Sequence, residues 1–167
     1  PCGEQPLPGY GCCDLGSLNL TAFVTDPFGD DAAFDFDRMR EVATVAVRML
    51  DLVLDATVWP LPQQAAESRA KRRIGLGFLG LGSALVMLGL RYDSSEGRAL
   101  AARISGALRD AAYTASIELA REKGAFPLVD ADKYLGRQCV ARLPEPLRAA
   151  IAEHGIRNSH LLSIAPT

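Results

Sequence analysis

The sequence predicts a mostly helical α/β fold in a single domain. Two long stretches, 37–56 and 95–123, have the apolar spacing or the helix-forming composition of α-helices. Two shorter stretches, 12–24 and 159–165, are typical of extended segments. The chain has 167 residues, 49% of them hydrophobic, and no linker long enough to separate a second domain. We therefore expect one core.

The N-terminal part of the chain is predicted to hold loops and one extended segment. Residues 1–11 contain three prolines and three glycines, which favour a loop. The extended segment 12–24 follows. Residues 26–35 contain Asp-Pro and Gly-Asp-Asp sequences and are typical of a turn-rich linker.

The first predicted helix covers 37–56, with Asp35 or Asp37 as its N-cap. Apolar residues recur there at three- and four-residue spacing, which predicts a stripe that faces the core. That stripe consists of Val42, Val45, Ala46, Met49, Leu50 and Val53. The two prolines of 59–62 end the helix, and a short helix is expected from Gln63.

The segment 74–90 is apolar almost all round, and we expect it to be a buried helix. Its start matches the G-x-G-x-x-G pattern of dinucleotide sites, which must follow a buried strand. The charged segment 67–73 cannot form such a strand, so the dinucleotide interpretation is rejected. Instead, small residues are expected to let this helix approach its neighbours closely. They are Gly75, Gly77, Gly80, Gly82, Ser83 and Ala84.

The C-terminal half is predicted to begin with the long helix 95–123, capped by serine at its start and followed by Gly124 as its C′ residue. A short helix is expected over 144–154. A short strand is expected over 159–165, before the final Pro-Thr.

The charge pattern argues against nucleic-acid and membrane partners. The net charge is −2, and the one dense basic run, at 69–73, is interpreted as a solvated helix start or loop. No apolar stretch reaches the roughly 18 residues needed to span a bilayer. Because the chain lacks an initiator Met and ends on Ala-Pro-Thr within an expected loop, we expect it to be an internal fragment of a longer protein.

Four cysteines, Cys2, Cys12, Cys13 and Cys139, form no C-x-x-C pair, and both histidines lie far from the N-terminal cluster. We therefore expect no metal site and reduced thiols in the cytoplasm. On an extended chain neighbouring side chains face opposite sides, so only one of the two adjacent cysteines can face the same site as Cys2. Cys139 is interpreted as structural.

The loop that contains Cys2 and Glu4 is the most informative stretch. In an extended backbone, residues two apart point the same way, so this thiol and this carboxylate could face one substrate. The alternative is a mobile surface loop in which both residues are incidental.

These residues closely resemble the finger-loop region of ribonucleotide reductase large subunits, most strongly those of the adenosylcobalamin-dependent class. The matching segments are 1–4, 13–20, 55–57 with 60–62, 72–77, 122–124 with 126–127, and 157–158 through 164–167. They follow one another in the order found in that family and cover most of the chain.

The resemblance implies a role for each matched site residue. Cys2 would become the thiyl radical that takes the 3′ hydrogen atom from the substrate ribose, and Glu4 would accept the 3′-hydroxyl proton. Cys13 would be one half of the dithiol that supplies two electrons, with its partner upstream. Ala165, Pro166 and Thr167 would begin the loop that holds the substrate phosphates. These six residues are the site residues that the resemblance implies.

The resemblance also implies the fold and the partners. The family fold is a ten-stranded α/β barrel, of which 1–24 would be the finger loop and following strand, 37–154 the helical region, and 159–167 a strand leading into the phosphate loop. The full-length protein would convert ribonucleotides to 2′-deoxyribonucleotides with adenosylcobalamin and a thioredoxin- or glutaredoxin-type reductant. The isolated chain is expected to be inactive and, because it exposes apolar faces, to form a homodimer or rearrange.

Two other functions stay open from the residues alone. One is a thiol–disulfide redox enzyme that uses Cys2 and Cys13 as its working pair. The other is a non-catalytic helical interaction module in which all the cysteines are incidental.

Overall fold

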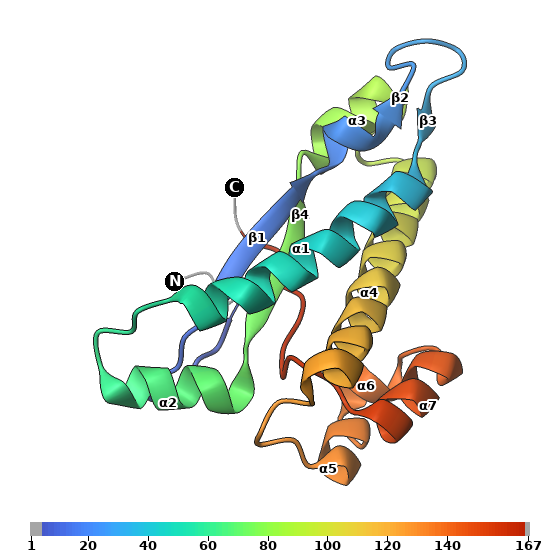
Figure 1. Ribbon diagram of the computed structural model, residues 1–167. Helices are drawn as coiled ribbons and strands as arrows, with labels where there is room; N and C mark the ends of the chain where they lie inside the picture. Colours follow the sequence, from blue (N-terminus) through green and yellow to red (C-terminus); the bar gives the residue numbers. More distant parts are fainter. Residues whose placement is uncertain (1–4, 166–167) are drawn as a thin grey trace.

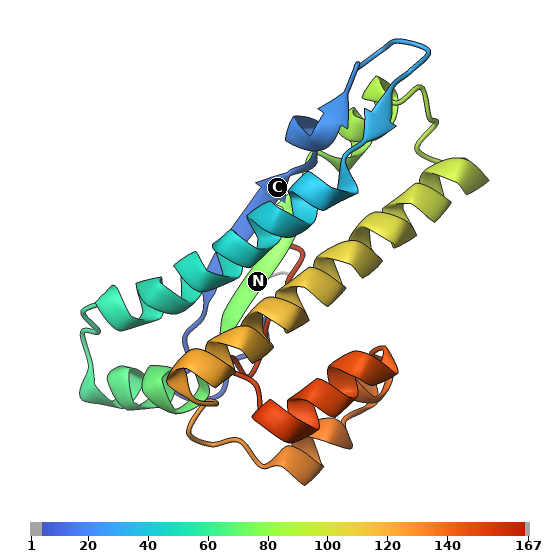
Figure 2. The same ribbon diagram turned by 45° about the vertical axis from the view of Figure 1, so that its right-hand side comes forward.

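The computed structural model describes residues 5–165 and has two helices lying over one face of a small parallel sheet (Figures 1 and 2). Its strands are β1 (Asp14–Asn19), β2 (Val24–Thr25), β3 (Ala33–Phe34) and β4 (Ile74–Leu79). Its helices are the 3-10 turn η1 (Leu20–Phe23), α1 (Phe36–Ala56), α2 (Pro62–Lys71), α3 (Leu81–Met87), α4 (Ser95–Lys123), α5 (Ala131–Leu135), α6 (Gln138–Ala141) and α7 (Glu145–His154). The fold is α/β and mostly helical, as predicted.

The central strand is β4, which pairs in parallel with β1 from Asp14 opposite Ile74 onward. On its other edge β4 bonds the C-terminal segment, because the Leu76 N–H donates to the Leu161 carbonyl at 2.8 Å and the Ser163 N–H donates back to Leu76 at 3.1 Å. The predicted strand 159–165 is thus reduced to a single parallel bridge. Side chains Ile74 and Leu76 enter the core under α1 and α4.

The expected extended segment 12–24 is interrupted. The Asn19 side chain accepts hydrogen bonds from the backbone N–H and the hydroxyl of Thr21, which turns the chain into η1 after six strand residues. The expected linker 26–35 is the turn of a short hairpin in which β2 pairs antiparallel with β3. This hairpin and α3 lie at the end of the molecule away from α5–α7 (Figure 1).

Helix α1 begins where predicted, with Asp35 accepting a hydrogen bond from the Arg38 N–H at 2.9 Å, but the predicted core stripe is only partly right, because Leu50 is buried and Ala46 packs against the core. Val45 and Met49 are 67% and 54% exposed. Besides Leu50, the buried apolar residues are Met39, Ala43, Val47 and Leu54. Both stripes have helical spacing, and packing against α4 and the β1–β4 pair selects the one that is buried.

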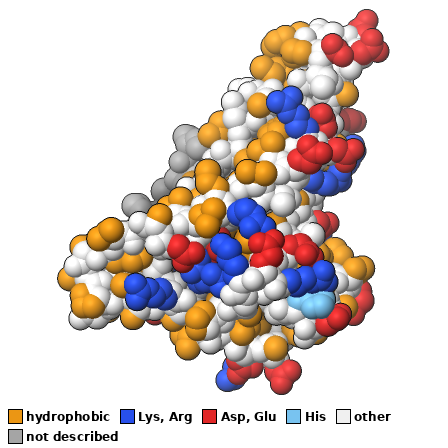
Figure 3. All heavy atoms as spheres, in the orientation of Figure 1, with side chains coloured by type: hydrophobic (Ala, Val, Ile, Leu, Met, Phe, Trp, Pro, Cys, Tyr) orange, Lys and Arg blue, Asp and Glu red, His pale blue; other side chains and the backbone are white. Residues whose placement is uncertain are grey.

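The remaining apolar face of α1 contributes to the hydrophobic surface in Figure 3. It carries Val45, Met49, Leu52 and Val53, which line one shallow hollow. The expectation that the isolated chain would form a dimer or rearrange stays a prediction.

The segment 74–90 is a strand followed by a helix, which corrects the predicted single helix. A short apolar run is compatible with either structure, and here both edges of β4 are bonded to other segments. Gly80 separates the two elements with φ +75°, a left-handed conformation that favours glycine. The two earlier glycines lie within the strand, not in a turn after it, so the dinucleotide interpretation remains rejected.

We expect Gly77→Ala to destabilise the fold. A methyl group at Gly77 would clash with the Ser163 backbone carbonyl, which cannot swing away as a side-chain end can. The expected loss is about 2 kcal/mol or more. Gly106→Ala is the matched control, because a methyl group there meets nothing within 4 Å inside α4 and should be neutral or stabilise by up to about 1 kcal/mol. Thermal unfolding of the full-length protein with hydrogen exchange of the β4 amides measures both. Equal stability of the two variants would contradict the close approach.

Helix α4 follows the sequence prediction closely. The Ser94 hydroxyl caps it by accepting from the Gly97 N–H at 3.0 Å, and Gly124 ends it with φ +86°. The helix packs on α1 along its length and on α7 near its C-terminal end. Helix α7 forms as expected, whereas the short helices α5 and α6 were not predicted. No helix in the described range 5–165 is long and apolar enough to cross a membrane.

Candidate functional site

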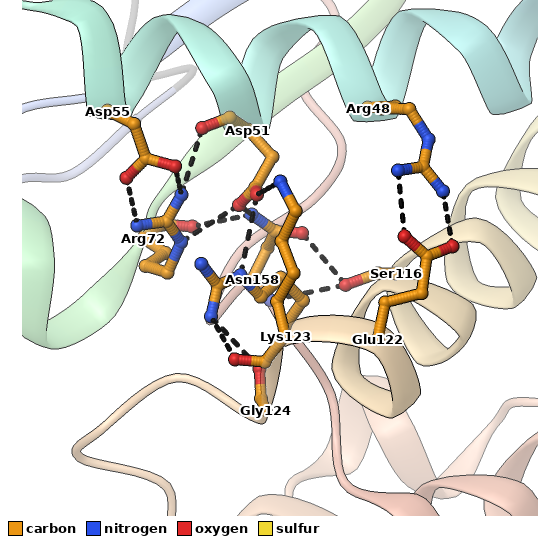
Figure 4. A network of polar contacts seen from close by, with 10 residues as sticks. Arg48, Asp51, Asp55, Arg72, Ser116, Glu122, Lys123, Gly124 and Asn158 are labelled. Atoms are coloured by element: carbon orange, nitrogen blue, oxygen red, sulfur yellow. Dashed lines mark hydrogen bonds and ion pairs between the residues drawn. The ribbon is translucent and has the colours of Figure 1, made fainter.

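A buried polar network fixes the starts of the two segments that flank the candidate site (Figure 4). Asp51 of α1 is fully buried and accepts hydrogen bonds from Arg72 Nε and Asn158 Nδ2, both at 2.9 Å. Arg72 lies two residues before β4, and Asn158 directly precedes the C-terminal segment. One carboxylate thereby sets the positions of two segments whose anchoring residues are 86 positions apart.

The same network extends to both sides. Arg72 forms a bidentate pair with Asp55, with N–O distances of 2.7 and 3.0 Å. Burial opposes the charge of Arg72, but its hydrogen bonds to the two aspartates keep its pKa raised. On α4, the Ser116 hydroxyl donates to Asn158 Oδ1 at 2.9 Å and accepts from the Asn158 N–H at 3.1 Å. Helices α1 and α4 are thus joined through the C-terminal segment.

The face of the β1–β4 pair turned away from α1 is lined by Gly75 and Gly77, and we call it the glycine face. A methyl group at Gly75 would lie 2.8 Å from Ser163 Cβ and 3.1 Å from Gln5 Nε2, and it would also meet Leu15. The N-terminal loop, β1 and the C-terminal segment therefore converge there. The absent Cβ atoms leave room for this convergence.

Cys13 belongs to the glycine face by strand alternation. Gly16 faces α1, since a methyl group there would contact Leu50 at 3.4 Å, whereas Leu15 covers Gly75 on the opposite face. Cys13 is two residues before Leu15 and therefore shares its side. Cys12 turns toward α2, where its Sγ lies 3.8 Å from the Gln64 carbonyl oxygen. These contacts support the prediction that adjacent cysteines face different sides.

Of the predicted site residues, the structure describes Cys13 and Ala165. Cys2, Glu4, Pro166 and Thr167 lie outside the described residues, so their roles stay predictions. The structure brings together residues that are close in sequence to these four. Gln5, next to Glu4 in the sequence, and Ser163, two residues before Ala165, both adjoin Gly75. Those two segments thus approach the face that carries Cys13.

The Cys13 thiol is neutral at ordinary pH. Burial raises its pKa to about 12, opposed by the positive charge of Arg73 and reinforced by Asp14 and Cys12. Burial also raises the pKa of Cys12. Cys12, Cys13 and the exposed Cys139 are all free thiols.

Arg73 is the residue of this site that sequence interpretation missed. The basic run 69–73 was expected to be solvated, but Arg72 and Arg73 are only 5% and 6% exposed. Arg73 Nη1 donates to the Pro6 carbonyl at 3.2 Å and so ties the N-terminal loop to the start of β4. Its place directly before an apolar strand was the available signal, because such a position adjoins the core.

A cavity of about 930 Å³ opens beside Arg73, between the N-terminal loop and α4–α6. Its wall includes His160, whose pKa is lowered to about 4 by burial and by the positive charges of Arg73, Arg137 and Lys71. His160 is therefore neutral at ordinary pH. In the part of the chain that the structure describes, no cluster of His, Cys, Asp and Glu could hold a metal ion.

Comparison with known proteins matches the chain over its whole length. The family model described as "Ribonucleotide reductase, barrel domain" covers residues 1–167. The chain is 41% identical to the vitamin B12-dependent ribonucleoside-diphosphate reductase of Mycobacterium tuberculosis (strain ATCC 25618 / H37Rv), over 100% of this chain and 21% of that protein.

Two further relatives match with similar identity. The vitamin B12-dependent ribonucleoside-diphosphate reductase of Thermoplasma acidophilum is 41% identical over 76% of this chain and 16% of that protein. The ribonucleoside-diphosphate reductase subunit alpha of Treponema pallidum is 37% identical over 98% of this chain and 19% of that protein. The chain thus spans about a fifth of the length of the curated relatives it matches.

Proposed function

This chain belongs to the ribonucleotide reductase barrel-domain family, and we propose from that premise that it supplies one wall of an active site that converts ribonucleotides to 2′-deoxyribonucleotides. The observation that carries the proposal is the full-length family match, whose motif residues fall on segments that meet at the glycine face. The complete ten-stranded barrel and its finger loop are part of the proposal. So is the inactivity of the isolated chain, which holds a fraction of that barrel.

The proposed chemistry divides among three residues of this chain. Cys2, as a thiyl radical, takes the 3′ hydrogen atom of the ribose, and Glu4 takes the proton of the 3′-hydroxyl. The 2′-hydroxyl then leaves as water and the 2′ carbon gains hydrogen. Glu4 returns its proton to the 3′ oxygen, and Cys2 returns the hydrogen atom to the 3′ carbon and becomes a thiyl radical again. Cys13 and a partner cysteine elsewhere in the full-length protein lose two electrons and two protons and become a disulfide. A reductant dithiol of the thioredoxin or glutaredoxin kind resets this disulfide.

Ala165, Pro166 and Thr167 are proposed to begin the loop that binds the substrate phosphates. The described end of that segment is well placed for this role. The Ser163 N–H donates to the Leu76 carbonyl, so the segment leaves the sheet at the edge of the glycine face. Backbone N–H groups of such a loop provide an anion site.

Adenosylcobalamin is the proposed radical source, because the two relatives at 41% identity are vitamin B12-dependent. When bound, it supplies a radical by homolysis of its cobalt–carbon bond. The corrin ring of the cofactor carries the cobalt, so the proposal requires no cluster of metal-ligating side chains from this chain. We place the cofactor with the rest of the full-length protein. The cytoplasm, which keeps thiols reduced, suits the proposed dithiol.

The thiol–disulfide oxidoreductase alternative is less well supported. Such enzymes use a thiolate with a lowered pKa, whereas burial raises the pKa of the Cys13 thiol to about 12. The interaction-module alternative does not require the two cysteines at all.

The full-length protein should form deoxynucleotides from ribonucleoside di- or triphosphates when both adenosylcobalamin and a dithiol are present. Chromatography of the nucleotide products tests this directly. Omission of either addition should stop multiple turnover. Product without cobalamin would contradict the proposed radical source, and no product under any condition would contradict the reductase proposal.

A further inference from the structure

We propose that Arg73 is a positioning residue for Cys13, holding the N-terminal loop in place while stabilising the thiolate that forms each time the Cys13 disulfide is reduced. The inference rests on the proposed function, since it assumes that Cys13 belongs to a dithiol that is oxidised and reset. It adds a residue to which the family resemblance assigned no role.

The strand register places the two residues side by side. Asp14 of β1 is opposite Ile74 of β4 in a parallel pair, so Cys13 and Arg73 each lie directly before the first paired residue of neighbouring strands. Neighbouring strands lie about 4.8 Å apart. Cys13 is two residues before Leu15, and Arg73 is two residues before Gly75. Because Leu15 and Gly75 lie on the glycine face and side chains alternate along a strand, Cys13 and Arg73 lie on that face too.

Arg73 is held where its charge acts on buried groups. Its side chain is 6% exposed, and Nη1 donates to the Pro6 carbonyl at 3.2 Å. The adjacent Arg72 is different, because two aspartates pair with it. A guanidinium bonded to a neutral carbonyl keeps its full charge available to neighbouring groups.

The charged surroundings of the two adjacent thiols show which neighbour favours a thiolate. Asp14 and Cys12 oppose ionisation of Cys13, whereas Arg73 favours it. Around Cys12, Asp14 and Glu67 oppose ionisation and Arg73 again favours it. Arg73 is therefore the cation that favours ionisation of both thiols.

The reductive step explains why a thiolate matters. A thiolate of the reductant attacks the partner sulfur and forms a mixed disulfide, while the protein S–S bond breaks and its electron pair leaves on the Cys13 sulfur. A leaving thiol of lower pKa departs faster. The Cys13 thiolate then takes a proton from water. The second thiol of the reductant closes its own disulfide and releases the partner cysteine, so two electrons pass from reductant to protein.

The test compares three variants in the full-length protein, with Cys13 alkylation by iodoacetamide followed by mass spectrometry across pH. Arg73→Gln removes the charge but retains a donor for the Pro6 carbonyl, and should slow Cys13 alkylation about tenfold at a fixed pH, equal to one pKa unit. Arg73→Lys keeps the charge and should stay within about threefold. Arg137→Gln is the matched control, because Arg137 lines the same cavity and acts on His160 but is not among the charges acting on Cys13.

A kinetic readout separates positioning from general damage. With Arg73→Gln, steady-state turnover that depends on external dithiol should fall about tenfold, in line with the lost pKa unit, while the first turnover of pre-reduced enzyme stays within about twofold. If Arg73 had only a structural role, the substitution would lower steady-state turnover and the first turnover equally. Failure of the parent protein to make deoxynucleotides would contradict the proposed function, yet the alkylation profile would still decide whether Arg73 acts on Cys13.

Two results would overturn the proposal. One is an Arg73→Gln protein whose Cys13 alkylation matches the parent at every pH. The other is an equal loss in Arg137→Gln. If Arg73→Gln does not fold, Asp14→Asn decides instead. Removal of the carboxylate that opposes Arg73 should speed Cys13 alkylation about tenfold, and an unchanged rate would show that neighbouring charge does not reach the thiol.

Discussion

Cys2→Ser in the full-length protein is expected to reduce deoxynucleotide formation below detection while the fold is retained. The proposed step requires an atom that carries an unpaired electron transiently, and a serine hydroxyl oxygen does so far less readily than sulfur. The change is nearly isosteric, so folding should not suffer. Product analysis together with circular dichroism of both proteins is the measurement.

Cys139→Ser is the matched control for that variant. Cys139 is an exposed free thiol on α6 that lines the cavity beside Arg73 but has no role in the proposed chemistry, and its replacement should change activity by no more than about twofold, as is usual for surface substitutions. If the Cys2→Ser variant still makes deoxynucleotides, the proposal that Cys2 forms the thiyl radical is wrong. Parallel loss in both variants would point to general thiol damage instead.

Asp51→Ala is expected to produce the largest loss of stability, about 3–5 kcal/mol, because it removes one of the two carboxylates that pair with the buried Arg72 and one acceptor of the buried Asn158 amide. Asp51 is fully buried, and Arg72 Nε, Asn158 Nδ2 and Arg157 Nε all donate to it. Its removal frees the starts of β4 and of the C-terminal segment together. Thermal unfolding and hydrogen exchange of both segments in the full-length protein would measure the loss.

Asp37→Ala on the same helix provides the comparison. Asp37 is 92% exposed and pairs with Arg40 at 2.7 Å, an arrangement worth at most about 1 kcal/mol. Asp51→Ala should therefore be several-fold more destabilising than this control. Similar unfolding midpoints for both variants would mean that the buried network does not hold the two segments. Loss of hydrogen-exchange protection confined to α1 in the Asp51→Ala variant would lead to the same conclusion.

Local signals in the sequence predicted the two long helices α1 and α4 well but not which side of α1 is buried. The Asp35 and Ser94 caps and the C-terminal Gly124 define α1 and α4 because capping depends on neighbouring residues alone. The buried side of α1 could not be predicted, since Val45 and Val47 both lie on stripes of helical spacing. Contact with α4, which is distant in sequence, decides between them.

The same limit explains the corrections at the site. The run after Arg73 is short, apolar and rich in glycine, and local periodicity could not distinguish a buried helix from a strand bonded on both edges. Buried arginines are rare, so a basic run is ordinarily solvated. Arg72 is buried because Asp51 and Asp55, one turn apart on α1, converge on it from a distant part of the sequence. Motif order, by contrast, led to the correct family.

Because Cys12 and Cys13 face opposite sides, the position of Cys13 depends more on the length of the loop before β1 than on its composition. Side chains in a strand alternate with every residue, so gain or loss of one residue just before Asp14 would exchange the two thiols. The sulfur now against Gln64 would face the glycine face, and Cys13 would turn toward α2. Between Gln5 and the start of β1, many different side chains could be tolerated, but an odd change in residue count would remove Cys13 from the glycine face, and with it the proposed dithiol, without the loss of a cysteine.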